Sequence, residues 1–147
     1  MLEPWVRQVM MDTLDPWRSQ EPALSVREMV DYIETEQEEG DLLFVGSKKA
    51  NLVIMARYVT PWVAEIHVFG KNKDGFALVR ATKKAFQHLF ANVGFHKLEA
   101  KLHDPKEVVL AKRSGMTLEG THPEAIKLED GTFTEEYSYG IIKEQSI

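Results

Sequence analysis

The sequence contains no cysteine among its 147 residues. This absence excludes disulfide bonds, thiolate metal sites and a cysteine nucleophile, and it suits a reducing compartment. The chain also lacks an apolar run of about 18 residues, so we expect no transmembrane helix and no membrane partner. The N-terminal residues carry acids without a long apolar centre, which argues against a signal peptide. We therefore expect a cytoplasmic protein.

Positive charge is also scarce. The chain has 18 Lys and Arg against 23 Asp and Glu, a net charge of -5, so we expect no nucleic-acid partner. The five histidines form no pair at the helical spacing of metal ligands, and we expect no metal site. A hydrophobic share of 44% and a charged share of 28% are typical of a globular chain. The length predicts a single domain over residues 1–147.

Two helices and three strands are expected in the first half. Apolar residues at helical spacing run from Trp5 to Leu14 and stop at Asp15-Pro16. Ser25 and Glu28 have the spacing of a capping box ahead of a second helix. Residues rich in aliphatic and β-branched side chains then predict a hairpin and a third strand: Asp41–Gly46, Asn51–Val59 and Trp62–Phe69.

The second half alternates between helices and strands. A wide apolar stripe predicts a long helix over Phe76–Phe90, and strict alternation predicts a strand over Lys97–His103. Asp104 has the position of a helix cap, and Gly115 ends that helix. A hairpin of Ala125–Leu128 and Phe133–Ile142 closes around Asp130-Gly131. The order α-α-β-β-β-α-β-α-β-β predicts an α/β (α+β) fold with a mixed sheet and helices on both sides.

The loop between Phe69 and Leu78 carries the clearest chemical signal. Glycine lets the backbone approach a ligand, and the start of the following helix offers unpaired N–H groups and the positive end of a dipole. These features suit a pyrophosphate. Basic residues also gather around this loop: Lys71, Lys73, Arg80, Lys83 and Lys84. The alternative is an ordinary strand-to-helix connection beside solvated lysines.

Asn72-x-x-Gly75-x-Ala77 resembles the (Gln/Arg)-x-x-Gly-x-(Gly/Ala) signature of the GNAT N-acetyltransferase superfamily. Several downstream segments resemble the ribosomal-protein N-terminal acetyltransferase branch of that superfamily: 96–100, 104–107, 112–116, 118–120 and 130–135. The resemblance implies a GNAT fold, with a mixed central sheet of about six to seven strands flanked by about four helices. It also implies acetyl-CoA as cosubstrate.

By this resemblance, acetyl-CoA contacts one set of residues: Val68, Phe69, Asn72, Lys73, Gly75, Phe76, Ala77 and Asp104. A backbone N–H near Val68 or Phe69 would hold the acetyl carbonyl. The acceptor would be an amine on a peptide, protein or small molecule, attacking directly because no cysteine is present to carry the acetyl group. The amine must lose a proton, and Glu65 and His67, two apart on one strand face, are the candidate catalytic residues. The alternatives are a solvent-facing pair or a core histidine.

Four positions depart from the GNAT pattern. Asn72 replaces Gln or Arg, Asp104 and Glu107 replace an Asn and a Ser, and Ala111 replaces an aromatic general acid. Helix capping alone is the alternative role of Asp104. The departures favour a second hypothesis, a catalytically inactive GNAT-like protein acting in assembly or binding, because the chain is also similar to compact GNAT-like proteins linked to bacteriophage head assembly. The sequence leaves open a homo-oligomer and a phage structural role.

Overall fold

The structure, a computed structural model, describes residues 2–13, 25–71 and 74–145. Two helices open it, α1 (Pro4–Thr13) and α3 (Val26–Glu38). Ser25 Oγ accepts a hydrogen bond from Glu28 N at 3.1 Å, and Glu28 Oε1 accepts one from Ser25 N at 3.3 Å. The predicted capping box is therefore confirmed. The predicted helix end at Leu14 and Asp15-Pro16 lies outside the described residues.

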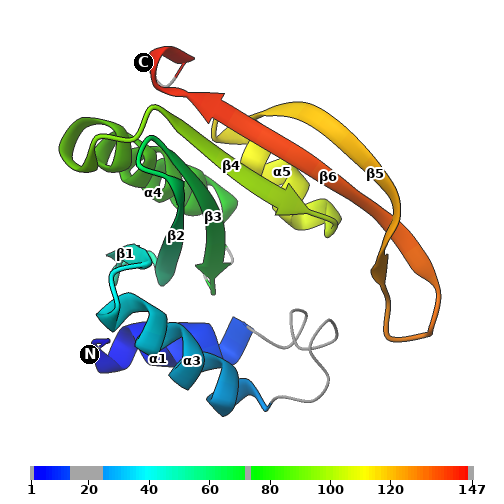
Figure 1. The fold of residues 1–147 in the computed structure, drawn as a ribbon, viewed down its shortest axis with the longest axis horizontal. Coiled ribbons are helices and arrows are strands. Elements are labelled where there is room, and N and C mark those ends of the chain that lie inside the picture. The colour runs from blue at the N-terminus through cyan, green and yellow to red at the C-terminus, as the bar shows by residue number, and fades with distance from the viewer. Residues whose placement is uncertain (1, 14–24, 72–73, 146–147) are drawn as a thin grey trace.

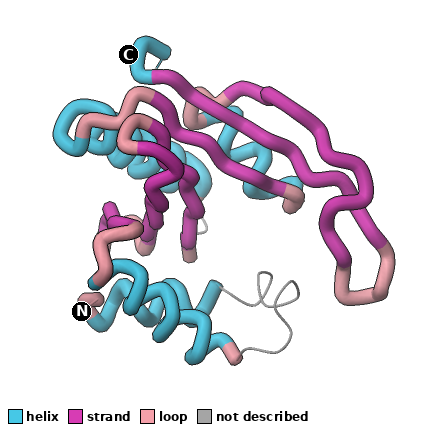
Figure 2. The backbone as a smooth tube through the Cα atoms, in the orientation of Figure 1, coloured by secondary structure: helices cyan, strands magenta, loops and turns pink. Residues whose placement is uncertain are grey.

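The remaining elements follow the predicted order (Figures 1 and 2). They are β1 (Leu42–Ser47), β2 (Leu52–Thr60), β3 (Val63–Gly70), α4 (Gly75–His88), the π-helical turn η1 (Leu89–Val93), β4 (Lys97–Leu102), α5 (Pro105–Arg113), β5 (Thr117–Lys127), β6 (Phe133–Ile142) and the 3-10 turn η2 (Lys143–Gln145). The strands form one mixed sheet in the order β1-β2-β3-β4-β6-β5. The predicted α+β class and mixed sheet are confirmed.

The prediction for β5 is wrong in extent. The strand begins at Thr117 rather than at Ala125. Its first half pairs only with β6 at the edge of the sheet and is mostly exposed, so it carries no apolar alternation. The pairing shifts register between His122 and Ile126, where Glu124 adopts a φ of 53°. A bulged edge strand of this kind lacks the period-2 pattern by which strands are read from sequence.

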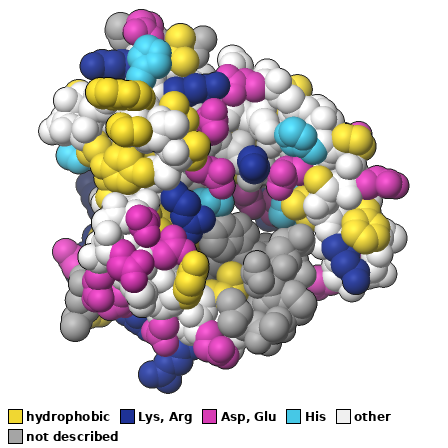
Figure 3. Space-filling model, in the orientation of Figure 1, with side chains coloured by type: hydrophobic (Ala, Val, Ile, Leu, Met, Phe, Trp, Pro, Cys, Tyr) yellow, Lys and Arg dark blue, Asp and Glu magenta, His cyan; other side chains and the backbone are white. Residues whose placement is uncertain are grey.

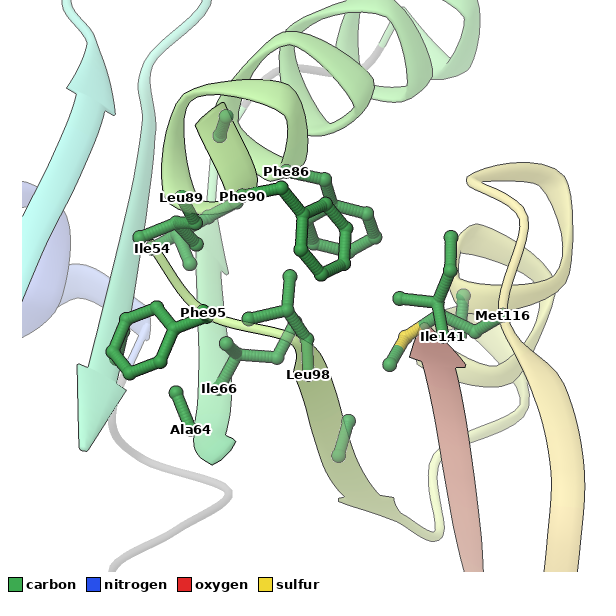
Figure 4. Close-up of a cluster of buried hydrophobic side chains, with 14 of the residues drawn as sticks. Ile54, Ala64, Ile66, Phe86, Leu89, Phe90, Phe95, Leu98, Met116 and Ile141 are labelled. Atoms are coloured by element: carbon green, nitrogen blue, oxygen red, sulfur yellow. The ribbon is translucent and has the colours of Figure 1, made fainter. Parts of the chain in front are cut away.

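Alternate residues of the sheet enter two apolar cores, one on each face. On one face Ile54, Ile66 and Leu98 pack beneath α4 and η1. Figure 4 shows Phe86 and Phe90 reaching down from that helical segment toward these strand residues. On the opposite face, α1 and α3 pack against a second group that comprises Val53, Met55 and Phe69. The sheet half formed by β1, β2 and β3 therefore lies between helices.

The strands β3 and β4 separate along their length. Their parallel pairing covers only the pairs Val63–Lys97, Ala64–Leu98 and Glu65–Glu99. Beyond this point β3 stays paired with β2 as far as Gly70, and β4 stays paired with β6 as far as Leu102. The two halves of the sheet diverge there, as Figure 1 shows. No described helix is both long enough and apolar enough to span a bilayer.

Candidate functional site

A cavity of about 680 Å³ opens where β3 and β4 separate. Its walls are the second half of β3, the end of β4, the N-terminal half of α4, and α5. The volume lies within the range of about 300–1,000 Å³ that is usual for small-molecule sites. The cavity is therefore a consequence of the short parallel pairing, which leaves room between the strands for a ligand.

The start of α4 forms one rim of the cavity. Gly75 lies there, and a Cβ added to it would meet no atom within 4 Å. Asp74 caps the helix: its Oδ1 accepts hydrogen bonds from Phe76 N at 3.0 Å and from Ala77 N at 3.3 Å. The amides that the sequence suggested for a phosphate are thus held by a carboxylate of the chain itself. Asn72 and Lys73, both predicted to contact the cosubstrate, lie outside the described residues.

The second half of β3 lines the opposite part of the cavity. Val68 and Phe69, which the GNAT resemblance would place beside the acetyl group, are both on this wall. The side chain of Phe69 is buried in the core beneath α1 and α3. Lys71 follows on the same wall, and its ammonium group pairs with Asp12 of α1. That pairing ties the cavity rim to the first helix.

The first turn of α5 supplies the most perturbed acid of the site. Asp104 caps the helix by accepting a hydrogen bond from Lys106 N at 2.9 Å, so its predicted capping role is confirmed. Glu107 lines the cavity one turn before Ala111. Loss of hydration among the cavity walls, with a further contribution from the charge of Asp104, raises the pKa of Glu107 to about 7. Glu107 is nonetheless an exposed residue.

A buried hydroxyl also lies at the cavity wall. Thr82 of α4 is only 1% exposed, and its Oγ1 has no hydrogen-bond partner among the described residues. Buried polar groups are nearly always paired, so an unpaired one beside a cavity marks a place where a ligand or water would bond. Thr82 is thus a candidate ligand contact on the cavity wall.

Glu65 and His67 are brought together on the sheet face that carries α1 and α3. Their alternation on β3 is as predicted, and His67 Nε2 lies 3.3 Å from Glu65 Oε1. The contact with His67 lowers the pKa of Glu65 and outweighs the opposite effect of burial. His67 lines the cavity, whereas Glu65 does not. Of the two candidate catalytic residues, only His67 therefore lies on the cavity wall.

The same face continues as a polar surface over β4, β6 and β5. Figure 3 shows acidic, basic and histidine side chains gathered there. Lys97 Nζ lies 2.9 Å from Glu119 and 3.5 Å from Glu99, and His122 Nε2 lies 2.9 Å from Ser138 Oγ. Within the described part of the chain, no group of three or more potential ligands is placed to hold a metal ion.

Sequence reasoning did not identify three residues of the site: Asp74, Thr82 and Glu107 in its cavity position. Asp74 had a readable signal, because an Asp directly before a helix start is a common N-cap. Thr82 reads as one member of the apolar stripe of α4, and its unpaired hydroxyl is visible only in three dimensions. Glu107 departs from the GNAT pattern in the sequence, but its environment depends on strands far away along the chain.

No family model and no curated protein matches this sequence. Solved structures do match. Spermidine N-acetyltransferase SpeG from Vibrio cholerae in complex with CoA and spermine has a TM-score of 0.77 at 17% identity, over 99% of this chain and 94% of that chain. A mutant of that enzyme has a TM-score of 0.74 at 15% sequence identity, over 99% of this chain and 95% of that chain. A structure described as a probable acetyltransferase has a TM-score of 0.67 at 13% sequence identity, over 95% of this chain and 86% of that chain. The chain therefore has the GNAT fold, and that prediction is confirmed.

Proposed function

We propose that the protein is an acetyl-CoA-dependent N-acetyltransferase that transfers an acetyl group to an amine by direct attack. The observation that carries the proposal is the cavity between the diverging strands β3 and β4, bordered by the start of α4. The same fold occurs in spermidine N-acetyltransferase, one structure of which holds CoA and spermine. An amine on a small molecule, peptide or protein is the proposed acceptor.

The described residues fit the cosubstrate in three respects. Open space at Gly75 gives a pyrophosphate access to the backbone at the start of α4. The unpaired hydroxyl of Thr82 offers a bond to an amide of the pantetheine arm. Val68 and Phe69 line the cavity on the β3 side, where the proposal puts the thioester carbonyl. The Asp74 carboxylate must release Phe76 N and Ala77 N before a phosphate takes these amides.

In the proposed reaction, acetyl-CoA supplies a thioester that is reactive toward amines. His67, on the cavity wall, accepts the proton that the attacking amine must lose. Glu65, whose Oε1 lies 3.3 Å from His67 Nε2, holds the imidazole ring in place. A backbone N–H of β3 at Val68 or Phe69 stabilises charge on the carbonyl oxygen.

Cofactor binding is the first test. Titration calorimetry with acetyl-CoA should detect binding at micromolar concentration. Gly75→Leu should abolish it, because the added side chain projects into the open space at the helix start. The fold of this variant should be intact, and Ala91→Leu, at an exposed alanine beyond α4, is the matched control.

Absence of binding and of thermal stabilisation at millimolar acetyl-CoA would exclude the proposal. Coenzyme release with a panel of amines then tests turnover.

A second candidate function is a catalytically inactive GNAT-like assembly or binding protein, such as one acting in bacteriophage head assembly. The observation that favours it is the Asp74 carboxylate on the amides of Phe76 and Ala77. Asp104, also acidic, caps the neighbouring helix α5. Binding of acetyl-CoA distinguishes the two candidate functions. If neither the wild type nor Asp74→Asn binds acetyl-CoA, the loop does not bind a coenzyme and the second candidate is favoured.

A further inference from the structure

Glu107 is a carboxyl group on the cavity wall that helix capping does not account for. It occupies the third position of α5 after the cap Asp104, as Glu28 occupies the third position of α3 after Ser25. Glu28 accepts a hydrogen bond from the backbone N–H of its cap. Within the described residues, Glu107 makes no such bond to Asp104 and lines the cavity instead. Its position thus calls for another role.

We infer that Glu107 is the proton donor to the sulfur that leaves when the acetyl group is transferred, an assignment that rests on the proposed function. Glu107 and Ala111 lie one turn apart on the face of α5 that lines the cavity. Val68 and Phe69 lie on the β3 wall of the same cavity, so a thioester bound beside them would share the cavity with the Glu107 carboxyl group.

The step balances with groups already present. The amine nitrogen forms a bond to the carbonyl carbon, and the carbon–sulfur bond breaks with its electron pair on sulfur. Sulfur takes the proton of the Glu107 carboxyl group, and the carboxylate recovers a proton from water before the next cycle. His67 removes the proton of the amine. The products are an N-acetyl amine and a free thiol, with no oxidant or further reactant.

The surroundings keep this carboxyl group partly protonated near neutral pH. The cavity walls and the charge of Asp104 raise the pKa of Glu107 to about 7. A thiolate, with a thiol pKa of about 8.5, is a stronger base and takes the proton readily. Other charged or titratable groups line the same cavity on α5, β4 and β3: Lys106, Arg113, Lys101, His103, His67 and Lys71.

The first experiment tests whether the Glu107 carboxyl group lies next to the sulfur of CoA, without measuring activity. Carbon-13 NMR of the Glu107 carboxyl group is recorded in the free protein, with CoA, and with desulfo-CoA, which lacks the thiol. We expect CoA to change the titration midpoint of Glu107, and desulfo-CoA, bound equally tightly, to leave it near that of the free protein. Equal effects of the two ligands would overturn the inference, because the carboxyl group would then not face the sulfur.

The second experiment compares Glu107→Gln with Glu28→Gln, a matched variant at the third position of α3. Glu107→Gln should lower kcat by about 10²-fold, leave KM for acetyl-CoA unchanged, and remove the fall of kcat at alkaline pH. Glu28→Gln should retain wild-type kcat. Circular dichroism checks that both variants fold. If the wild type turns over and Glu107→Gln has the same kcat and pH profile, Glu107 is not the proton donor, and the proposed acetyltransferase function is unaffected. Absence of wild-type turnover and of acetyl-CoA binding would exclude both proposals.

Discussion

Replacing Glu107 with Gln should make the folded protein more stable at alkaline pH. The carboxyl group has a pKa of about 7 in the folded protein against 4.5 as a free side chain. The folded state therefore holds a proton that the unfolded state releases between these values. The stability from this proton is fully present below pH 4.5 and is lost as the pH rises through 7. Gln cannot ionise, so the variant avoids this loss.

The magnitude follows from the same two values. A pKa difference of about 2.5, from 4.5 to about 7, corresponds to about 3.5 kcal/mol at about 1.4 kcal/mol for each pKa unit. Glu107 is an exposed residue, and solvent weakens the effect of its surroundings, so we expect about 1 kcal/mol. Glu107→Gln should thus gain about 1 kcal/mol over the wild type between pH 4.5 and pH 9.

Urea unfolding of both proteins at intervals from pH 4.5 to pH 9 measures this difference. Asp104→Asn is the informative second variant, because Asn caps a helix as well as Asp but removes the charge that adds to the raised pKa of Glu107. Its pH dependence should be smaller than that of the wild type. A constant free-energy difference between Glu107→Gln and wild type across the whole range would refute the reasoning.

Three further outcomes are expected. Asp74→Asn should keep the melting temperature, since Asn caps as well as Asp, and should tighten acetyl-CoA binding several-fold by calorimetry; weaker binding would contradict the role given to the Asp74 charge. Glu65→Gln should lower kcat by about tenfold with little change in stability, because the residue acts through His67; unchanged turnover would remove it from the mechanism. Phe86→Ala should cost about 3–5 kcal/mol in urea unfolding, since Phe86 is 2% exposed; a loss below about 1 kcal/mol would mean that the core refills the space.

Local signals in the sequence predicted most of the fold. The Ser25–Glu28 capping box, the Asp104 cap and the apolar stripe of α4 depend on residues within a few turns of one another, and each is present. The alternation of β3 placed Glu65 and His67 on one face before any contact was known. These features share one property: neighbours along the chain determine them.

Features set by distant contacts were not predicted. The cavity exists because the pairing of β3 with β4 ends at Glu65 and Glu99, and no local pattern records where two strands part. The raised pKa of Glu107 arises from those same walls. The early start of β5 at Thr117 depends on pairing with β6, since its own residues are exposed. Such features require the assembled sheet.

The irregular outer strand β5 also affects how the molecule behaves at high concentration. An edge strand offers unpaired N–H and C=O groups to a neighbouring chain, which is a common route to aggregation. In β5, Pro123 removes one donor and Glu124, at a φ of 53°, bends the strand out of register beside it. An incoming strand therefore meets a gap in the hydrogen-bonding edge and a charged side chain, and the long hairpin can extend from the sheet without recruiting further copies into a continuous β-ribbon.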